Sequence, residues 1–303
     1  MVPFYLGIDP QLKRTFMVLM NAHGEVIDKQ RISNDDISRY LQEKVPQETY
    51  AVLEATRNWP FMYDLLQEHV QQVDLVHAKA VKTIANAAVK TDQIDASTLA
   101  HLARLNYIPK AYAATKEMRD LRQLLRHREW MVNQRSRAKN RIHAVLAGYN
   151  LVSPVTDLFG VAGRQYLDEV MEKELRPAAR MVVNDHLDII DHLGERIRCL
   201  EKGITLSEAQ TYVMRLLMSM PGVGRLTALT ILAEIGDISR FNSPKSLCSW
   251  AGLTPKVHSS DTVVQHGHIT KEGSRYLRTA MVQTATVACR VTPKWYVIHS
   301  HLA

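Results

Sequence analysis

The sequence predicts an α/β domain with a mixed sheet at the N-terminus, followed by a helical connector and a small, mostly helical C-terminal domain. Strand-like and helix-like segments alternate over residues 4–89, which is typical of an α/β layer. From residue 92 onward the apolar residues recur mainly at helical spacing. We therefore expect three regions, namely residues 1–112, 113–215 and 216–303.

The first expected elements are strands. The run FYLGID at residues 4–9 is short and apolar, and TFMVLMNAHGEVIDKQRI reads as strand, turn and strand, with the turn around Asn21 to Gly24. Further along we expect a helix over 33–45, a strand over 50–53, a helix over 60–72, a strand over 73–76 and a helix or loop over 78–89.

The central part of the chain has the pattern of long helices. Residues 92–106 carry apolar side chains near the helical period, and Pro109 ends that segment. A second helix is predicted over residues 115–147, and residues 165–215 again read as helical. The apolar spacing in these segments is like that of a coiled coil.

The C-terminal part begins near Ser219 with PGVGRLTALTILAEIG. Gly222 and Gly224 resemble the hairpin of a helix-hairpin-helix element, in which backbone N–H groups approach a phosphate. A plain turn between two helices explains the same glycines equally well. A polar stretch follows over residues 257–274, and a helix over 275–290 closes the region.

Positive charge is concentrated in one segment. The chain has a formal net charge of +7 and a pI near 9.3, and residues 116–141 contain nine Lys or Arg against three acids. A solvated helix face is one explanation, and binding of nucleic acid is the other. The residues we expect to contact nucleic acid are Arg119, Arg122, Arg126, Arg135, Arg137, Lys139 and Arg141, with Lys271 and Arg275 near the C-terminus.

Other features exclude whole classes of protein. No stretch approaches the roughly 18 apolar residues of a membrane span, and no secretory leader is evident. We therefore expect a bacterial cytoplasmic protein associated with the nucleoid. Cys199, Cys248 and Cys289 show no metal-binding spacing, so we expect buried, reduced thiols rather than a zinc site or disulfides.

Acidic residues follow the expected strands. Asp9 ends the first strand and Glu54 ends a later one, while Asp92 and Asp95 share a helix face because they lie three residues apart. Carboxylate oxygens suit Mg²⁺, and two such ions about 3.5–4 Å apart can clamp a phosphate. The alternatives are a turn cap at Asp9, a surface acid at Glu54, and a helix cap formed by Thr91 and Asp92. The pattern alone leaves both interpretations open.

Several motifs together resemble a known family. They are GID at 7–9, LEAT at 53–56, KTDQIDA at 90–96, MPGVGRLTALTILAEIGDISRF at 220–241, WAGLTP at 250–255 and ITKEGSRYLR at 269–278. In this order they are similar to the DEDD transposases of bacterial insertion sequences, the "one-ten" group related to Piv-type DNA invertases. The resemblance covers nearly the whole chain.

The resemblance implies a fold and a set of site residues. It implies a RuvC-like, RNase H-type N-terminal domain whose acids, here Asp9, Glu54, Asp92 and Asp95, bind Mg²⁺, with two ions expected. It also implies a serine nucleophile a few residues after GLTP, and the matching position here is Ser260.

Three departures from the family pattern accompany this assignment. Asp261 stands where the family has glycine, which keeps Ser259 as a rival nucleophile, and Arg57 stands where glycine usually follows LEAT. Members also commonly continue beyond a segment like WYVIHSHLA into a further basic helix.

The resemblance also implies a function and partners. It predicts a recombinase that cleaves and rejoins double-stranded DNA at element ends and target through a phosphoserine, guided by a bridge RNA and acting as a homo-oligomer, either a dimer or a tetramer. No membrane partner is expected. Two alternatives stay open at this point: a RuvC-like junction nuclease without a covalent serine, and a shortened member that binds nucleic acid without cleaving it.

Overall fold

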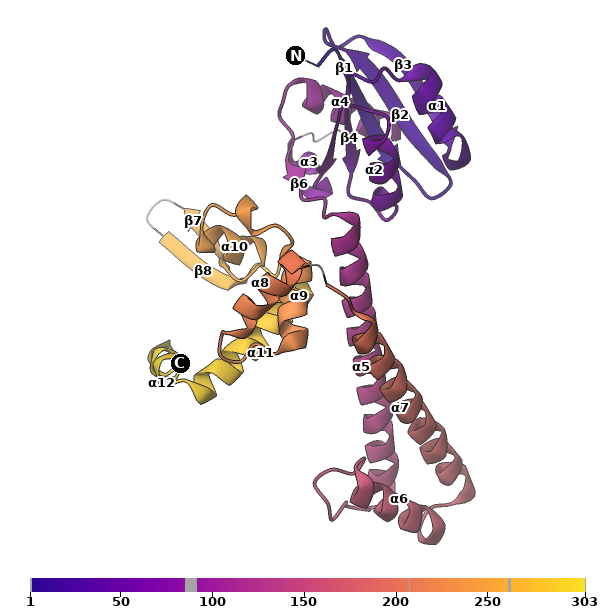
Figure 1. The fold of residues 1–303 in the computed structure, drawn as a ribbon, viewed down its shortest axis with the longest axis vertical. Helices are drawn as coiled ribbons and strands as arrows, with labels where there is room; N and C mark the ends of the chain where they lie inside the picture. Colours follow the sequence, from indigo (N-terminus) through magenta and orange to yellow (C-terminus); the bar gives the residue numbers. More distant parts are fainter. Residues whose placement is uncertain (1, 85–91, 207, 261–262, 303) are drawn as a thin grey trace. The chain divides into compact units, whose positions relative to one another are not determined.

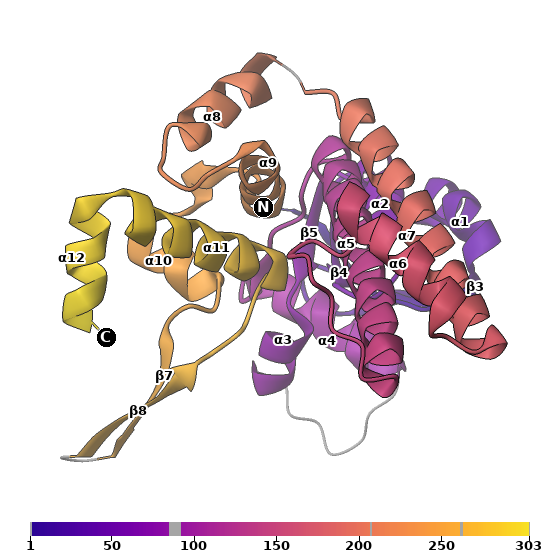
Figure 2. The same ribbon diagram turned by 90° about the horizontal axis from the view of Figure 1, so that it is seen from below.

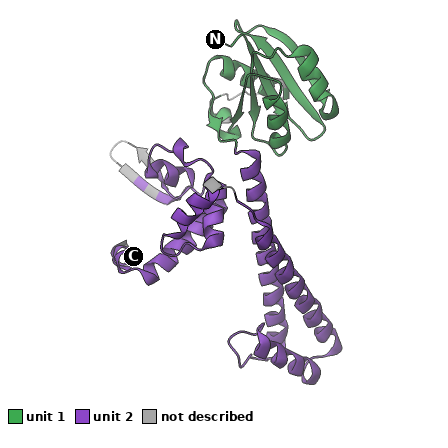
Figure 3. Ribbon diagram, in the orientation of Figure 1, with its two compact units in different colours: residues 1–113 green, residues 114–303 purple. Residues whose placement is uncertain are grey.

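A computed structural model describes residues 2–84, 92–206, 208–260 and 263–302. The chain forms two compact units, residues 1–113 and 114–303 (Figure 3). The further division of the second unit near residue 215 stays a prediction. Among the described residues, no helix is both long and apolar enough to cross a membrane.

The first unit is built on a six-stranded mixed sheet with the strand order β3-β2-β1-β4-β5-β6 (Figure 1). Its strands are β1 (Phe4–Pro10), β2 (Arg14–Asn21), β3 (Val26–Ser33), β4 (Thr49–Glu54), β5 (Gln72–Val76) and β6 (Lys110–Ala111). The central strand β1 runs antiparallel to β2 and parallel to β4. This arrangement confirms the mixed α/β sheet predicted for the N-terminal region.

Helices cover both faces of this sheet. They are α1 (Ile37–Lys44), α2 (Trp59–Gln67), α3 (Ala78–Ile84) and α4 (Asp92–Arg104). Leu6 and Ile8 of β1 pack in one core with side chains of α1 and α2. Tyr5 of β1 packs on the opposite face, with Leu99 and Ala103 of α4. Strand side chains alternate between faces, so each strand of the sheet centre serves both cores.

The second unit begins with two long helices that pack along one another. These are α5 (Lys116–Gly148) and α7 (Pro177–Gly203), connected through α6 (Val161–Lys173). Figure 1 shows α6 at the turn between the two long helices. Ile142 and Leu146 of α5 pack with Val183 and Leu187 of α7 in a buried core. The predicted helix over 115–147 corresponds to α5, whereas the stretch 165–215 that was expected to be helical is divided into α6, α7 and α8.

The rest of the second unit is a small helical group with a two-stranded ribbon. Its elements are α8 (Glu208–Met218), α9 (Arg225–Ile235), α10 (Pro244–Trp250), β7 (Pro255–Ser260), β8 (Val263–Ile269), α11 (Arg275–Val291) and α12 (Pro293–Leu302). The ribbon β7-β8 extends away from α10 and α11 (Figure 2). Leu229 and Leu232 of α9 pack with Leu277 of α11 and with Leu121 and Leu125 of α5.

The structure differs from the sequence analysis in two features of this region. The sequence predicted only a polar stretch after WAGLTP, and most of that stretch forms the antiparallel ribbon β7-β8. The cysteines were expected to be buried, and this expectation is wrong. Cys199 and Cys248 are exposed and Cys289 is half-buried.

Candidate functional site

Asp9 and Glu54 lie side by side at the ends of two neighbouring strands. Ile8 pairs with Leu53 in the parallel register of β1 and β4, so the next residues along are Asp9 and Glu54. Both follow a residue of the α1/α2 core and therefore point to the other face, which α4 covers. Asp9 is only 8% exposed, and Glu54 is half-buried.

A close helix-sheet contact sets the position of α4. A Cβ atom built on Gly7 would lie 1.9 Å from the carbonyl oxygen of Ala96 and 2.6 Å from the backbone nitrogen of Ala100. Only glycine at this position of β1 allows the backbone of α4 to approach so closely. Gly7 of the GID motif and Ala96 of KTDQIDA are therefore packing partners.

The same contact brings the first turn of α4 toward Asp9. Gly7 meets Ala96, whereas Tyr5, nearer the start of β1, packs with Leu99 and Ala103 further along α4. The helix thus runs opposite to β1, and its first turn, with Asp92 and Asp95, lies at the end of the strand that carries Asp9. All four predicted acids come to one edge of the sheet. Thr91, the other suggested cap residue, lies outside the described residues.

Arg31 of β3 is a neighbour that the sequence analysis did not identify. Its guanidinium lies 3.3 Å from a carboxylate oxygen of Asp92 and donates a hydrogen bond to Gln11 Oε1 at 3.1 Å. The register explains this position, because Asp9 pairs with Phe16 and Phe16 pairs with Arg31 across three strands. The predicted turn alone does not give this register, because a β-bulge between Leu19 and Met20 shifts the pairing of β2 with β3 and so decides which face Arg31 occupies.

Two side chains connect the loops that follow β1 and β4. Thr56 Oγ1 donates to the carbonyl oxygen of Pro10 at 3.3 Å, and Asn58 Nδ2 donates to that of Gln11 at 2.8 Å. These bonds join the segments that directly follow Asp9 and Glu54. The loops that follow β1 and β4 are therefore held to one another at this edge of the sheet. Arg57 is exposed and lies in the loop after β4.

The donor set at this edge suits a hard divalent cation. Four acidic side chains provide the oxygen ligands that Mg²⁺ prefers, and one of them, Asp9, is almost removed from water. Across the parts of the chain that the structure describes, no three His, Cys, Asp or Glu side chains are gathered closely enough to hold a metal. Asp92 instead faces Arg31. Cation binding by these acids would require their side chains to come closer together.

The predicted serine lies on the ribbon of the second unit. Ser259 and Ser260 are the last residues of β7 and pair with Val264 and Val263 of β8. The side chains of both serines, and Asp261, lie outside the described part of the chain. The structure thus gives the backbone position of this segment only.

The base of the ribbon is held by glycines with positive φ. Gly252 of WAGLTP has φ +70°, and a Cβ there would lie 2.1 Å from the carbonyl oxygen of Glu272. Gly273 has φ +74°, and a Cβ there would lie 2.1 Å from the carbonyl oxygen of Trp250. Arg278 donates to the carbonyl oxygens of Ala251, Glu272 and Gly273. The glycines of these motifs therefore bring two backbone segments together.

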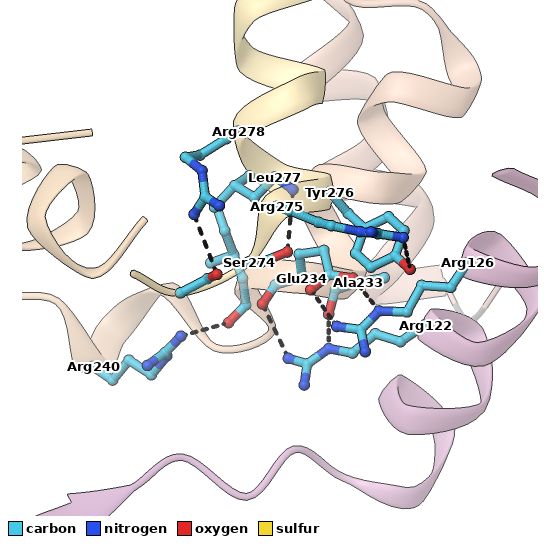
Figure 4. A network of polar contacts seen from close by, with 12 residues as sticks. Arg122, Arg126, Ala233, Glu234, Arg240, Ser274, Arg275, Tyr276, Leu277 and Arg278 are labelled. Carbon is cyan, nitrogen blue, oxygen red and sulfur yellow. Dashed lines mark hydrogen bonds and ion pairs between the residues drawn. The ribbon is translucent and has the colours of Figure 1, made fainter. Parts of the chain in front are cut away.

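Two of the arginines expected to contact nucleic acid form bonds inside the second unit (Figure 4). Arg122 donates to the backbone carbonyls of Ala233 at 2.5 Å and Glu234 at 3.0 Å. Arg126 forms two parallel bonds, at 2.9 and 2.8 Å, with the carboxylate of Glu234, which is 4% exposed. The hydrogen bond to Glu234 raises the pKa of Arg126. Both side chains therefore join α5 to the end of α9.

The other basic candidates differ in their surroundings. Lys139 lies over the ring of Phe159, with 4.6 Å from Nζ to the centroid, and Arg275 lies 4.7 Å over Tyr276. Arg137 and Arg141 are exposed and form no ion pair with the described residues. The remaining candidates are Arg119 and Arg135, both half-buried, and Lys271, which is exposed.

The fold and motifs agree with comparisons to known proteins. A profile of DEDD transposases of the IS110 type matches residues 6–151, and one described as the transposase IS116/IS110/IS902 family matches residues 214–299. The chain belongs to the IS110 family of transposases. The first match contains the four acids, and the second contains the ribbon and the glycine turns.

Relatives of this IS110-family chain are similar over most of its length. The transposase for insertion sequence element IS1328 of Yersinia enterocolitica is 25% identical over 93% of this chain and 83% of its own length. The pilin gene-inverting protein of Moraxella lacunata is 25% identical over 78% of this chain and 66% of its own. Among solved structures, T. thermophilus RuvC in complex with a Holliday junction substrate matches 36% of this chain and 99% of its own chain, with a TM-score of 0.25 and 10% identity.

Proposed function

We propose that this IS110-family transposase cleaves and rejoins DNA strands with the help of divalent cations held by Asp9, Glu54, Asp92 and Asp95. The proposal is supported by the backbone positions of these acids on the α4 face at one edge of the sheet, in a chain whose family model is named for DEDD acids. The proposed ion is Mg²⁺, and two ions match the number of ligands. When bound, the cations would stabilise negative charge on a phosphate.

The protein's own residues perform the other steps of the proposed reaction. Asp9 and Glu54 hold positions on the strands, and with Asp92 and Asp95 they would hold the cation. Ser260 is the proposed nucleophile, with Ser259 as the rival. Its oxygen attacks a DNA phosphorus and the 3′ or 5′ oxygen of the cut strand leaves, so that the phosphoserine conserves a phosphodiester for rejoining.

The proposed partners are double-stranded DNA and a bridge RNA that selects the element ends and the target. Support comes from the excess of basic residues on α5 and from the family. The acids belong to the first unit and the serine to the second, so the reaction requires both units, supplied by one chain or by different chains of a homo-oligomer.

Removal of single carboxylates tests the metal site. We expect Asp92→Asn or Asp95→Asn to abolish Mg²⁺-dependent strand cleavage while DNA binding and thermal unfolding stay unchanged. Asp188→Asn is the matched control, because Asp188 is an exposed aspartate on the helix α7. If the Asp92 and Asp95 variants lose folding and binding together, the pair is structural and the proposal is wrong.

Covalent trapping tests the serine. Nicked suicide DNA substrates should give a protein-DNA adduct that Ser260→Ala abolishes and Ser259→Ala retains. The reverse result assigns the role to Ser259. Cleavage without any adduct would identify a junction nuclease that uses water, and nucleic-acid binding without cleavage of any substrate would identify a non-catalytic member.

A further inference from the structure

One side of α5 carries a stripe of basic and polar residues with one tryptophan, and among them Arg126 also bonds to α9. Its members recur at intervals of three and four, which places them on one side of the helix, and they include no acid. Six of the eight are exposed and two are half-buried. We call this set the α5 stripe; it consists of Lys116, Arg119, Gln123, Arg126, Trp130, Gln134, Arg137 and Arg141.

Trp130 is the one aromatic member of the α5 stripe, and it is 54% exposed. The buried side of the helix is formed by other residues, among them Leu125, Met131 and Ala138. Trp130 belongs to none of the buried cores of the described chain. Its apolar face is therefore presented to solvent within a basic surface.

The ring of Trp130 is held by a neighbour one turn earlier. His127 stacks on it, with ring centroids 5.7 Å apart and planes inclined by 11°. This contact restricts the side-chain rotamers of the indole. A large flat ring with limited freedom loses little conformational entropy when a second flat ring stacks on it.

Free positive charges lie further along the same stripe. Arg137 and Arg141 are exposed and form no ion pair with the described residues. At 1.5 Å of rise per residue they lie about 10 and 16 Å along the helix axis from Trp130. This span corresponds to roughly three to five nucleotides at about 3.4 Å each along a stacked strand.

We propose that Trp130, stacked on His127, is a platform for an unpaired nucleobase of a strand whose phosphates contact Arg137 and Arg141. This proposal rests on the nucleic-acid binding contained in the proposed function, and it adds the chemical form of the ligand at this surface. A base within a duplex has both faces covered by its neighbours, so only an unpaired or extruded base can stack on the indole.

The basic and polar character of the α5 stripe favours a nucleic-acid strand over a protein helix as its ligand. A tryptophan in an apolar stripe would indicate helix-helix docking, but the other seven members are polar or basic. Aromatic side chains that alternate with basic ones are the usual combination in sites for single strands, where rings stack on bases and guanidinium groups contact phosphates.

Binding measurements with the whole protein test the platform. The variants are Trp130→Ala, Trp130→Tyr, which keeps a ring, and Leu124→Ala as a control, since Leu124 lies on the same helix outside the stripe and is 42% exposed. The probes are fluorescently labelled oligothymidylate, oligouridylate, a chain of abasic deoxyribose phosphates of the same length, and a duplex. Circular dichroism and thermal unfolding verify that each variant folds.

We expect Trp130→Ala to weaken binding of the single strands by about 5- to 150-fold, the range for loss of one base-aromatic stack. Binding of the abasic chain and the duplex should not change. Trp130→Tyr should restore most of the affinity, and Leu124→Ala should match the wild type. A difference between the thymidine and uridine probes shows whether DNA or RNA is preferred.

Two results overturn the platform and leave the proposed function intact. One is equal affinity of the Trp130→Ala variant and the wild type for single strands. The other is an equal loss on single strands, abasic chain and duplex, because such a loss does not depend on a base. If the wild type binds no nucleic acid of any kind, the platform and the nucleic-acid part of the proposed function are wrong together.

Discussion

Replacement of Arg126 by alanine should destabilise the second unit more than replacement of its partner Glu234 by glutamine. Arg126→Ala leaves a carboxylate that is 4% exposed without its counter-charge. Loss of one member of a buried ion pair typically costs about 3–5 kcal/mol. The Arg126 side chain is itself 43% exposed, so water can reach the carboxylate after its removal, and we reduce the expected cost to about 2–3 kcal/mol.

The second variant, Glu234→Gln, removes the negative charge of the side chain and keeps its size. Glu234→Gln retains a hydrogen-bond acceptor for Arg126 and leaves a cation that solvent already reaches, so we expect a cost of about 1 kcal/mol. The double variant should be more stable than Arg126→Ala alone, since no buried charge is left. Urea unfolding of all four proteins gives the free energies and the coupling between the two sites.

The same double-mutant cycle also distinguishes the contribution of the ion pair to stability from a contribution of Arg126 to phosphate binding. Glu234→Gln breaks the salt bridge but keeps the guanidinium, so nucleic-acid affinity should not fall in that variant. If Arg126→Ala costs no more stability than Glu234→Gln and the two effects simply add, the pair does not hold α5 to α9 and our reasoning from burial is refuted.

Two further predictions concern the first unit. Gly7→Ala should lower the free energy of unfolding by about 3 kcal/mol, because the new Cβ would lie 1.9 Å from the Ala96 carbonyl oxygen. Strand cleavage should be lost although all four acids remain. Full cleavage activity in this variant would contradict the close packing of β1 against α4. Burial, the largest contribution, raises the pKa of Asp74, but hydrogen bonds from Lys110 and Tyr50 outweigh it and lower the pKa overall. Stabilisation from this carboxylate is thus present at neutral pH and lost as pH falls below about 4. Asp74→Asn should cost about 1–2 kcal/mol at pH 7 and nothing in acid, as urea unfolding at both pH values would measure.

The apolar patterns predicted most of the elements, because burial determines them. Residues 4–10 and 49–54 form the expected central strands, and α5 and α7 occupy segments with helical apolar spacing. The two-residue strand β6 has no apolar pattern of its own. It exists because its backbone pairs with β5 and because Lys110 bonds to Asp74 at 2.7 Å.

The ribbon β7-β8 was missed for a related reason. Its sequences PKVHSS and VVQHGHI are largely polar, and the described positions of both strands are mainly exposed. No buried face imposes the period of two that identifies a strand. The pairing instead follows from the backbone contacts at Gly252 and Gly273, which bring the ends of the ribbon together. Contacts between segments this far apart leave no periodic signal.

The sequence predicted the positions of the candidate acids better than it predicted the residues around them. Asp9 and Glu54 were placed by their positions at the ends of two expected strands, and helix periodicity paired Asp92 with Asp95. The partner of Asp92 required the hairpin register, because Arg31 lies two strands from Asp9. The internal bonds of Arg122 and Arg126 required knowledge of where α9 ends, and local sequence carries no information on that contact.

The arginines of α5 form two groups that differ in their surroundings. Arg122 and Arg126 neutralise the end of α9 and a buried carboxylate, so they contribute to folding whether or not nucleic acid is present. Arg137 and Arg141 are exposed, form no ion pair with the described residues and belong to the α5 stripe, which contains no acid. Mutual repulsion of such charges is unfavourable in the free protein and is relieved when phosphates neutralise them. We therefore propose that a polyanion gains most from binding to the part of α5 beyond Trp130, while Arg122 and Arg126 before it attach α5 to α9.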